Sequence, residues 1–214
     1  MNGLWYNCAG GETIAATGNN LLDSVTQEEP DATFVARIKD GDAGAFGELV
    51  QRHQRAVYGI VSRMVSDRDD VDDIVQDVFV QAFKSMDAFK EQSAFGTWIY
   101  RIAVNTTIKH LRKAKIRRAP SIDDPAAGLG DSLVSNGSEG PDEQAEKAER
   151  REAVRRAIET LPEHHRSVVV LHYFQNLSCD EIAKITGCSV GTVWSRLHYA
   201  CRKLKGQLAW LGGG

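Results

Sequence analysis

Apolar side chains recur at steps of three and four residues through most of residues 31–118, and this period constrains the fold more than any other feature. Two of the stripes comprise Val71, Ile74, Val75, Val78, Ala82 and Phe83, and then Trp98, Ile99, Ile102, Ala103, Ile108 and Leu111. Such steps place side chains on one face of an α-helix, whereas a half-buried strand needs strict alternation. No convincing alternation occurs. The sequence predicts an all-α fold.

Two helical domains are expected, joined by a flexible acidic linker. Residues 119–142 contain three prolines, four glycines and four serines, a composition typical of a tether. Helical periodicity resumes near Glu143, and residues 1–30 show no sustained period. The expected organisation is a disordered extension (1–30), a first domain (31–118), the linker (119–142), a second domain (143–210) and a short tail (211–214).

Charge is distributed in blocks that the net charge of −3 hides. Residues 84–118 hold nine Lys or Arg against two Asp or Glu, while residues 1–83 hold six against fourteen. No apolar run approaches the roughly 18 residues that span a bilayer, so no membrane insertion and a cytoplasmic location are expected. The four cysteines form no C-x-x-C pair, and neither a metal site nor any other cofactor is expected.

The C-terminal part carries the most specific local pattern, "LSCDEIAKITGCSVGTVWSRLHYACRKL". Ser178 and Glu181 have the spacing of a capping box at the start of a short helix. Gly187 can end that helix in a tight turn, and Ser189 can cap a second, longer one. Two helices joined in this way form a helix-turn-helix, whose second helix enters the major groove of DNA.

The outward face of this second helix has residue types that contact DNA. The apolar stripe runs through Val190, Val193, Leu197, Cys201 and Leu204, which leaves Thr192, Ser195, Arg196, Tyr199 and Lys203 facing away. Arg196 suits guanine edges, and Arg202 and Lys203 suit phosphates. A helical hairpin with a solvated basic face is the alternative, because short helix pairs with a glycine turn are common.

A central segment, "AFGTWIYRIAVNTTIKHLRKAKIRR", combines aromatic and basic residues. Lys109, Arg112 and Lys113 share one helical face that can neutralise phosphates. The preceding loop contains Phe89, Lys90, Ser93 and Phe95, types that suit unstacked single-stranded bases. The alternative is that the aromatic residues are core and the lysines solvated, and for Trp98 the core reading is preferred because it continues the apolar stripe.

Six aspartates crowd the stretch "DRDDVDDIVQD" at residues 67–77. Asp70, Asp73 and Asp77 share an outward helical face, where like charges repel and favour a basic partner. The stretch is also similar to the Mg²⁺-binding aspartates of all-α prenyl-transfer enzymes. That chemistry needs a second acidic motif and a deep apolar cavity, which neither half of this chain is large enough to enclose, so a basic protein surface is the preferred partner and no enzyme activity is expected.

Taken together, these motifs resemble bacterial RNA polymerase sigma factors of the extracytoplasmic-function (ECF) group. The resemblance rests on "GDAGAFGELVQRHQRAVYGIV", "DDIVQDVF", "FGTWIYRIAVN" and "VGTVWSRLHYACRKL". Residues of about 31–118 resemble sigma region 2, and those of about 150–206 resemble region 4. The linker is too short for the additional helical domain of the larger sigma factors.

The resemblance implies a role for each segment. The residues Asp73, Gln76, Asp77 and Phe79, with Asp70 beside them, match the segment that docks on the clamp helices of the largest subunit of core RNA polymerase. Asn105, Lys109 and Arg112 match the helix that meets the upstream-proximal promoter element, and the 87–95 loop matches the part that captures a flipped base. The helix at 189–203, which includes Trp194, matches the reader of the distal element.

These expectations define a promoter-specificity subunit that binds core polymerase and promoter DNA, with an anti-sigma factor as a possible further partner. Two features depart from the family pattern: Trp194 lies where a basic residue is common, and residues 1–30 have no counterpart. The alternative function is a stand-alone helix-turn-helix regulator that binds its operator without polymerase.

Overall fold

The computed structural model describes residues 29–118 and 141–212, and the described residues are helical with no strand. In the first half (residues 31–118) the elements are α1 (Asp31–Lys39), the 3₁₀ turn η1 (Ala43–Ala45), α2 (Phe46–Met64), α3 (Arg68–Lys84), η2 (Met86–Ala88) and α4 (Phe95–Arg118). The all-α prediction is confirmed. The expected extension, linker and tail lie outside the described residues for 1–28, 119–140 and 213–214.

Local sequence signals explain where the first helices begin and end. Gly41 adopts a positive φ of 99°, which closes α1 and allows the chain to reverse toward α2. Asp42 stabilises this turn because its carboxylate accepts hydrogen bonds from the Gly44 backbone N–H and the Arg37 guanidinium. Asp67 caps α3 by accepting from the backbone N–H of Asp69 at 3.1 Å. The turn around Gly41 therefore separates α1 from α2.

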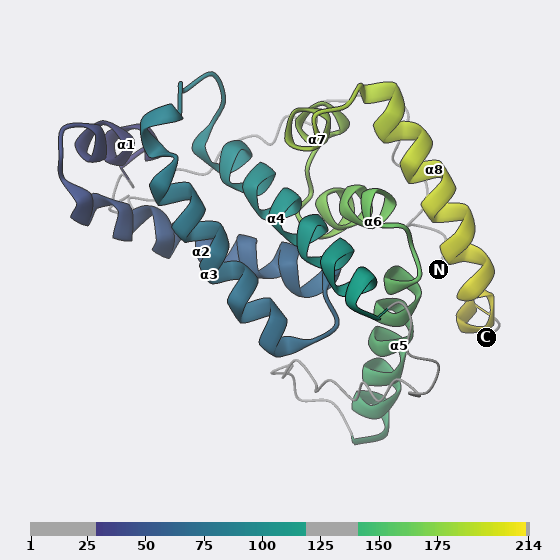
Figure 1. The fold of residues 1–214 in the computed structure, drawn as a ribbon. Coiled ribbons are helices and arrows are strands. Elements are labelled where there is room, and N and C mark those ends of the chain that lie inside the picture. Colours follow the sequence, from purple (N-terminus) through teal and green to yellow (C-terminus); the bar gives the residue numbers. More distant parts are fainter. Residues whose placement is uncertain (1–28, 119–140, 213–214) are drawn as a thin grey trace, which may run out of the picture.

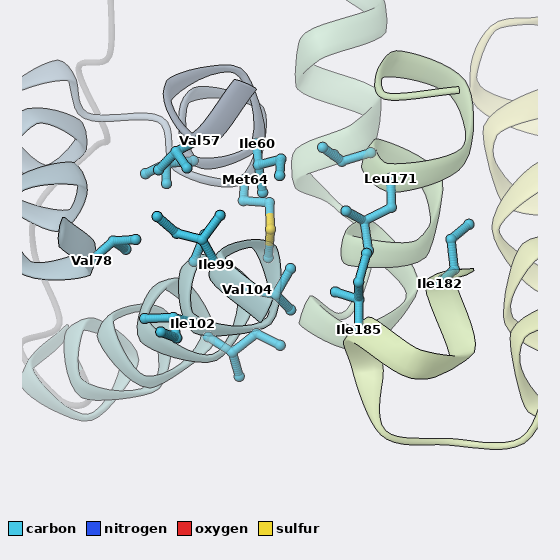
Figure 2. Packing of buried hydrophobic residues seen from close by; sticks show 14 of the residues in the cluster. Val57, Ile60, Met64, Val78, Ile99, Ile102, Val104, Leu171, Ile182 and Ile185 are labelled. Carbon is cyan, nitrogen blue, oxygen red and sulfur yellow. The ribbon is translucent and has the colours of Figure 1, made fainter. Parts of the chain in front are cut away.

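Helices α2, α3 and α4 pack together through the stripes that the sequence shows. Leu49, Val57, Ile60, Val78 and Ile99 are almost completely buried between them. Figure 2 shows Val57, Ile60, Val78 and Ile99 meeting at the centre of this bundle. Burial of these apolar side chains is the main stabilising contribution to the first half.

The second half (residues 141–212) contains α5 (Pro141–Glu159), α6 (Glu163–Val169), the π-helical turn η3 (Val170–Phe174), α7 (Cys179–Thr186), α8 (Val190–Gln207) and η4 (Ala209–Gly212). The capping box at the start of α7 is formed: the Ser178 N–H donates to Glu181 Oε2 at 2.8 Å, and the Glu181 N–H donates to Ser178 Oγ at 3.3 Å. Gly187 ends α7 with φ 67°. The predicted helix-turn-helix is thus α7 and α8.

The two halves pack against one another and share one continuous apolar core. Figure 1 shows α4 between the α2–α3 pair and the α6–α7 pair, and α4 contacts all four helices. Leu171 and Ile185 of the second half approach Met64 and Val104 of the first (Figure 2). The sequence predicts two domains on a tether, and its periodicity does not indicate that they pack together.

Arg166 of α6 occupies the junction between the halves and is only 8% exposed. Its guanidinium donates to the backbone carbonyls of Met64, at the end of α2, of Glu159, at the end of α5, and of Leu161. Carbonyls at helix ends have no partner within their own helix, and they carry the negative end of the helix dipole. Arg166 therefore joins three chain segments by satisfying these carbonyls.

A second cation also bridges the halves. The Arg63 guanidinium of α2 lies over the Phe174 ring of η3, 4.7 Å from its centroid. Among the described residues, no helix combines the length and apolar character needed to cross a bilayer.

Candidate nucleic-acid and protein interfaces

Helix α3 presents the predicted acidic face to solvent. Val71, Ile74, Val78 and Ala82 point into the core, and Asp73, Gln76 and Asp77 are exposed on the other side. The last three therefore form a surface that a basic partner can reach.

The other two residues predicted for this surface are less accessible. The Asp70 carboxylate lies 3.1 Å from Nε2 of His110 on α4 and is therefore turned toward that helix. Phe79 is half-buried and packs against the core. These two residues support the acidic face from behind rather than project from it.

Two apolar residues complete the exposed side of α3. Val80 is 43% exposed and Phe83 is 47% exposed, and both follow Asp73 and Asp77 at helical spacing. The expectation that Phe83 belongs to the buried stripe is wrong: its ring leans on Phe46, with centroids 5.1 Å apart, at the edge of the core. Exposed apolar side chains beside acidic ones suit a protein partner, and sequence periodicity assigned Phe83 to the opposite face.

The loop before α4 packs on a cluster of aromatic side chains. Phe89 and Phe95 are 4% and 3% exposed, and their ring centroids lie 5.9 Å apart. Trp98 covers both rings, at 4.8 Å from Phe89 and 5.5 Å from Phe95. In this arrangement Phe89 and Phe95 are core residues. Their rings do not face solvent, which differs from the expectation that they are available to unstacked bases.

The polar residues of the same loop remain accessible. Lys90 is exposed and Ser93 is half-exposed. Between them Glu91 adopts a positive φ of 56°, and its carboxylate pairs with Lys39 of α1. The loop is therefore anchored by an ion pair on one side and by the aromatic cluster below, with its polar atoms outward.

Helix α4 exposes a narrow basic strip. Asn105, Lys109, Arg112 and Lys113 are all exposed, whereas residues 102–104 and 107–108 are buried against its neighbours. Thr107 is satisfied inside the core by donating to the Ala103 carbonyl at 2.7 Å. The four residues predicted to contact DNA from α4 share one solvent-facing strip.

Helix α8 presents a broad outward face. Its buried stripe is Val193, Leu197, Ala200 and Leu204, with Cys201 only half-buried. Trp194 and Tyr199 are 40% and 39% exposed. Ser189, Ser195 and Arg202 are exposed, while Thr192, Arg196 and Lys203 are half-buried.

Three of the α8 residues make contacts within the second half. Lys203 donates to the Thr160 carbonyl at 2.6 Å, and Arg196 lies 3.6 Å from the Cys188 sulfur. The ring of Tyr199 lies 4.6 Å from that of His165. These contacts position the helix, and sequence analysis did not foresee them.

His164 of α6 contacts the basic strip of α4. The Arg112 guanidinium donates to His164 Nε2 at 2.8 Å, which requires a neutral imidazole. Burial lowers the pKa of His164, and the nearby charges of Arg196 and Arg112 lower it further. The ring is therefore held in the form that accepts this hydrogen bond.

Comparison with known proteins agrees with this geometry. The family models "Sigma-70 region 2" and "Sigma-70, region 4" match residues 49–117 and 151–204. The chain is 41% identical over 180 residues to the ECF RNA polymerase sigma-E factor of Escherichia coli (strain K12), which covers 82% of this chain and 93% of that protein. It is 37% identical over 180 residues to the RNA polymerase sigma-H factor of Pseudomonas aeruginosa, covering 82% and 92%.

A solved structure is similar as well. The structure of CnrH in complex with the cytosolic domain of CnrY matches with a TM-score of 0.59 and 27% identity, over 84% of this chain and 97% of that one. Region 2 precedes region 4 in this chain. Region 2 lies in the half that contains α3 and α4, and region 4 lies in the half that contains α7 and α8. With a relative 41% identical across most of both chains, this chain belongs to the ECF group of RNA polymerase sigma factors.

Proposed function

We propose that this sigma factor binds core RNA polymerase through the exposed face of α3 and contacts promoter DNA through α4 and α8. The observation that carries the assignment is the separation of charge: Asp73 and Asp77 project from α3, and Lys109 and Arg112 project from α4. The acidic face repels the phosphate backbone and attracts a basic protein surface. The basic strip has the opposite preference.

The polymerase surface comprises the three exposed residues Asp73, Gln76 and Asp77, together with Val80 and Phe83. The exposed apolar area of Val80 and Phe83 gives the contact a desolvated centre, and the acidic residues give it orientation. The clamp helices of the largest polymerase subunit are the proposed partner. Asp70 and Phe79 act by holding α3 in place.

The proximal promoter element is assigned to the polar residues of the 87–95 loop and to the α4 strip. Lys90 and Ser93 offer hydrogen-bond donors at the loop surface, and Asn105, Lys109, Arg112 and Lys113 continue this surface along α4. Phe89 and Phe95 shape the loop from below. The distal element is assigned to α8, with Arg202 and Lys203 on phosphates and the first turns toward the base edges.

An anti-sigma protein is a further proposed partner, because a similar solved structure is that of the sigma factor RpoE in complex with the anti-sigma factor NepR from Bartonella quintana. We also assign the chain to the cytoplasm, where polymerase and promoter DNA are found, and we propose that it has no catalytic activity of its own. Titration calorimetry with Mg²⁺ tests the last point. Heat of binding that disappears in Asp73→Ala would support the metal-enzyme alternative instead.

Run-off transcription with purified core polymerase tests the main proposal. The wild-type chain is expected to direct promoter-dependent transcripts from a genomic template library. Asp77→Lys is expected to abolish both transcription and binding to core polymerase, because it places a cation in the contact. Glu48→Lys makes the same charge change at an exposed position of α2 and serves as the matched control.

Two results would overturn the proposal. One is the absence of promoter-dependent transcripts with the wild-type chain. The other is tight, specific binding of a DNA operator by the free protein that core polymerase leaves unchanged, which is the behaviour of a stand-alone regulator. Equal loss of activity in Asp77→Lys and Glu48→Lys would remove the assignment of α3.

A further inference from the structure

The first turns of α8 expose one large apolar side chain, Trp194. It is 40% exposed and lies just over one turn after the N-cap residue Ser189. Across residues 29–118 and 141–212, no ring stacks on its indole and no atom hydrogen-bonds to it. A single exposed apolar residue is ordinary on a protein surface. This one is unusual because of its place, since the N-terminal part of a recognition helix is the part that contacts base edges.

The hydroxyl groups around Trp194 are already engaged within the helix. Ser189 Oγ accepts from the Thr192 backbone N–H at 3.2 Å and lies 2.9 Å from Thr192 Oγ1. Ser195 Oγ donates to the Thr192 carbonyl at 3.0 Å. These bonds help to satisfy the backbone at the start of α8 and engage the hydroxyl hydrogen of Ser195, so that Ser195 can meet a base only as an acceptor.

The cation nearest to Trp194 in the sequence is also only partly accessible. Arg196 is half-buried and its guanidinium lies 3.6 Å from the Cys188 sulfur. The charged residues that remain exposed, Arg202 and Lys205, lie in the second half of the helix, where they suit phosphates. The leading turns of α8 therefore offer DNA an apolar surface with few free donors beside it.

Of the four bases, only thymine presents an apolar group in the major groove, its 5-methyl group. A flat indole that meets this methyl group buries apolar area on both partners, which favours thymine over the other bases. We propose that Trp194 is a specificity-determining residue that recognises a thymine in the distal promoter element through its 5-methyl group. This inference rests on the proposed function, in which α8 enters the major groove.

Replacing thymine by deoxyuridine tests this contact, because it removes the methyl group and leaves the pairing edge unchanged. Holoenzyme is titrated against labelled promoter duplexes in which each thymine of the distal element is replaced in turn. At one or two positions the replacement is expected to weaken wild-type binding about fourfold, the effect of one buried carbon group. Trp194→Ala holoenzyme is expected to bind the thymine and deoxyuridine duplexes equally at those positions.

Two further variants make the test specific. Tyr199→Ala removes an aromatic residue of similar exposure from the same helix, and it is expected to retain the wild-type penalty for deoxyuridine. Trp194→Arg is expected to lose the penalty and to show a steeper dependence of binding on salt, because a guanidinium adds a phosphate contact. Thermal unfolding checks that both Trp194 variants remain folded, which is expected for an exposed position.

The outcomes separate this inference from the proposed function. Promoter-dependent transcription without any deoxyuridine penalty, or from a distal element that needs no thymine, overturns the role of Trp194 and leaves the sigma-factor assignment intact. A penalty that persists in both Trp194 variants assigns the methyl contact to another residue and also overturns it. Failure of wild-type transcription itself overturns the proposed function.

Discussion

Helices α4 and α8 both face DNA in the proposed function, yet the fold holds them in different ways. Through residues 95–111, helix α4 is covered by α2 and α3 from its own half and by α6 and α7 from the other, so only a narrow strip of this part is exposed. Helix α8 buries a single stripe and exposes a broad face with two aromatic residues. The first helix is part of the core, and the second lies at the surface.

This difference indicates two ways of contacting nucleic acid. A helix that is fixed on most sides offers a constant row of charges, which suits the regular spacing of phosphates. A helix that is held along one stripe leaves whole side chains free to enter a groove. The prediction is that α4 contributes chiefly salt-dependent affinity and that the first turns of α8 contribute chiefly sequence preference.

The largest expected effect comes from Arg166→Met. This variant tests whether the packing of α6 and α7 on α4 depends on the hydrogen bonds that Arg166 makes at the junction between the halves. The change leaves the carbonyls of Met64, Glu159 and Leu161 without their donor, and each unsatisfied buried group costs about 1–3 kcal/mol. Urea unfolding is expected to show a loss of about 3 kcal/mol or more. Arg37→Met, which removes the exposed pair with Asp42 and an exposed contact with the Phe34 ring, is the control and is expected to cost less than about 1 kcal/mol. Equal losses in the two variants would mean that Arg166 has no special role.

The next effect separates the two helices by salt dependence. Lys109→Ala is expected to weaken promoter binding by holoenzyme and to reduce the slope of log K against log salt by about 0.9, the value for one phosphate contact. Trp194→Ala is expected to weaken binding without changing that slope. Fluorescence titrations at several salt concentrations measure both. A slope change in the Trp194 variant, or none in the Lys109 variant, would break the proposed contrast.

A smaller effect is expected from the cap of α7. Ser178→Ala removes the hydroxyl of the capping box and is expected to lower the free energy of unfolding by about 1 kcal/mol. Because α7 supports α8, recognition of the distal element is expected to weaken more than recognition of the proximal one. Footprinting of each element measures this difference. Ser66→Ala, at an exposed position between α2 and α3, is the control.

The smallest effect is expected on the stability of the protein at acidic pH. Hydrogen bonds from Arg155, with a further contribution from Arg156, lower the pKa of Glu152 on α5 to about 2. A lowered pKa in the folded state stabilises the protein above the ordinary value of 4.5, and this contribution is lost as the pH falls from 4.5 toward 2. Glu152→Gln is expected to flatten the pH dependence of unfolding in this window, by a modest amount because the carboxylate is partly exposed and screened by salt. Identical profiles for wild type and variant would contradict the prediction.

Local features of this fold could be predicted from the sequence because they depend on neighbouring residues. The capping box of Ser178 and Glu181, the turn at Gly187 and the stripe of α3 as far as Ala82 all follow from spacing and backbone preference. The exposed acids Asp73 and Asp77 could be predicted for the same reason. Each of these features lies within one helix or one turn.

Features that depend on distant segments could not be predicted in this way. The apolar period of α4 indicates that one face of this helix is buried. It does not indicate which helices bury it, and so it does not predict the contacts with α6 and α7. The burial of Phe89 and Phe95 depends on how a loop folds back on α2 and α4, which has no period. One signal was present: residues 168–171 are four consecutive apolar residues, and such a run indicates a segment surrounded on all sides.

The hydrogen bond between Arg112 and His164 limits how DNA can be bound in this arrangement. The charge of Arg196 also lowers the pKa of this imidazole, so residues assigned to two different promoter elements act on one side chain. Successive major-groove sites on a duplex are about 34 Å apart for every helical turn between them. A promoter whose elements are separated by a turn or more cannot meet both residues at once while this bond persists, so simultaneous reading requires the two halves to move apart.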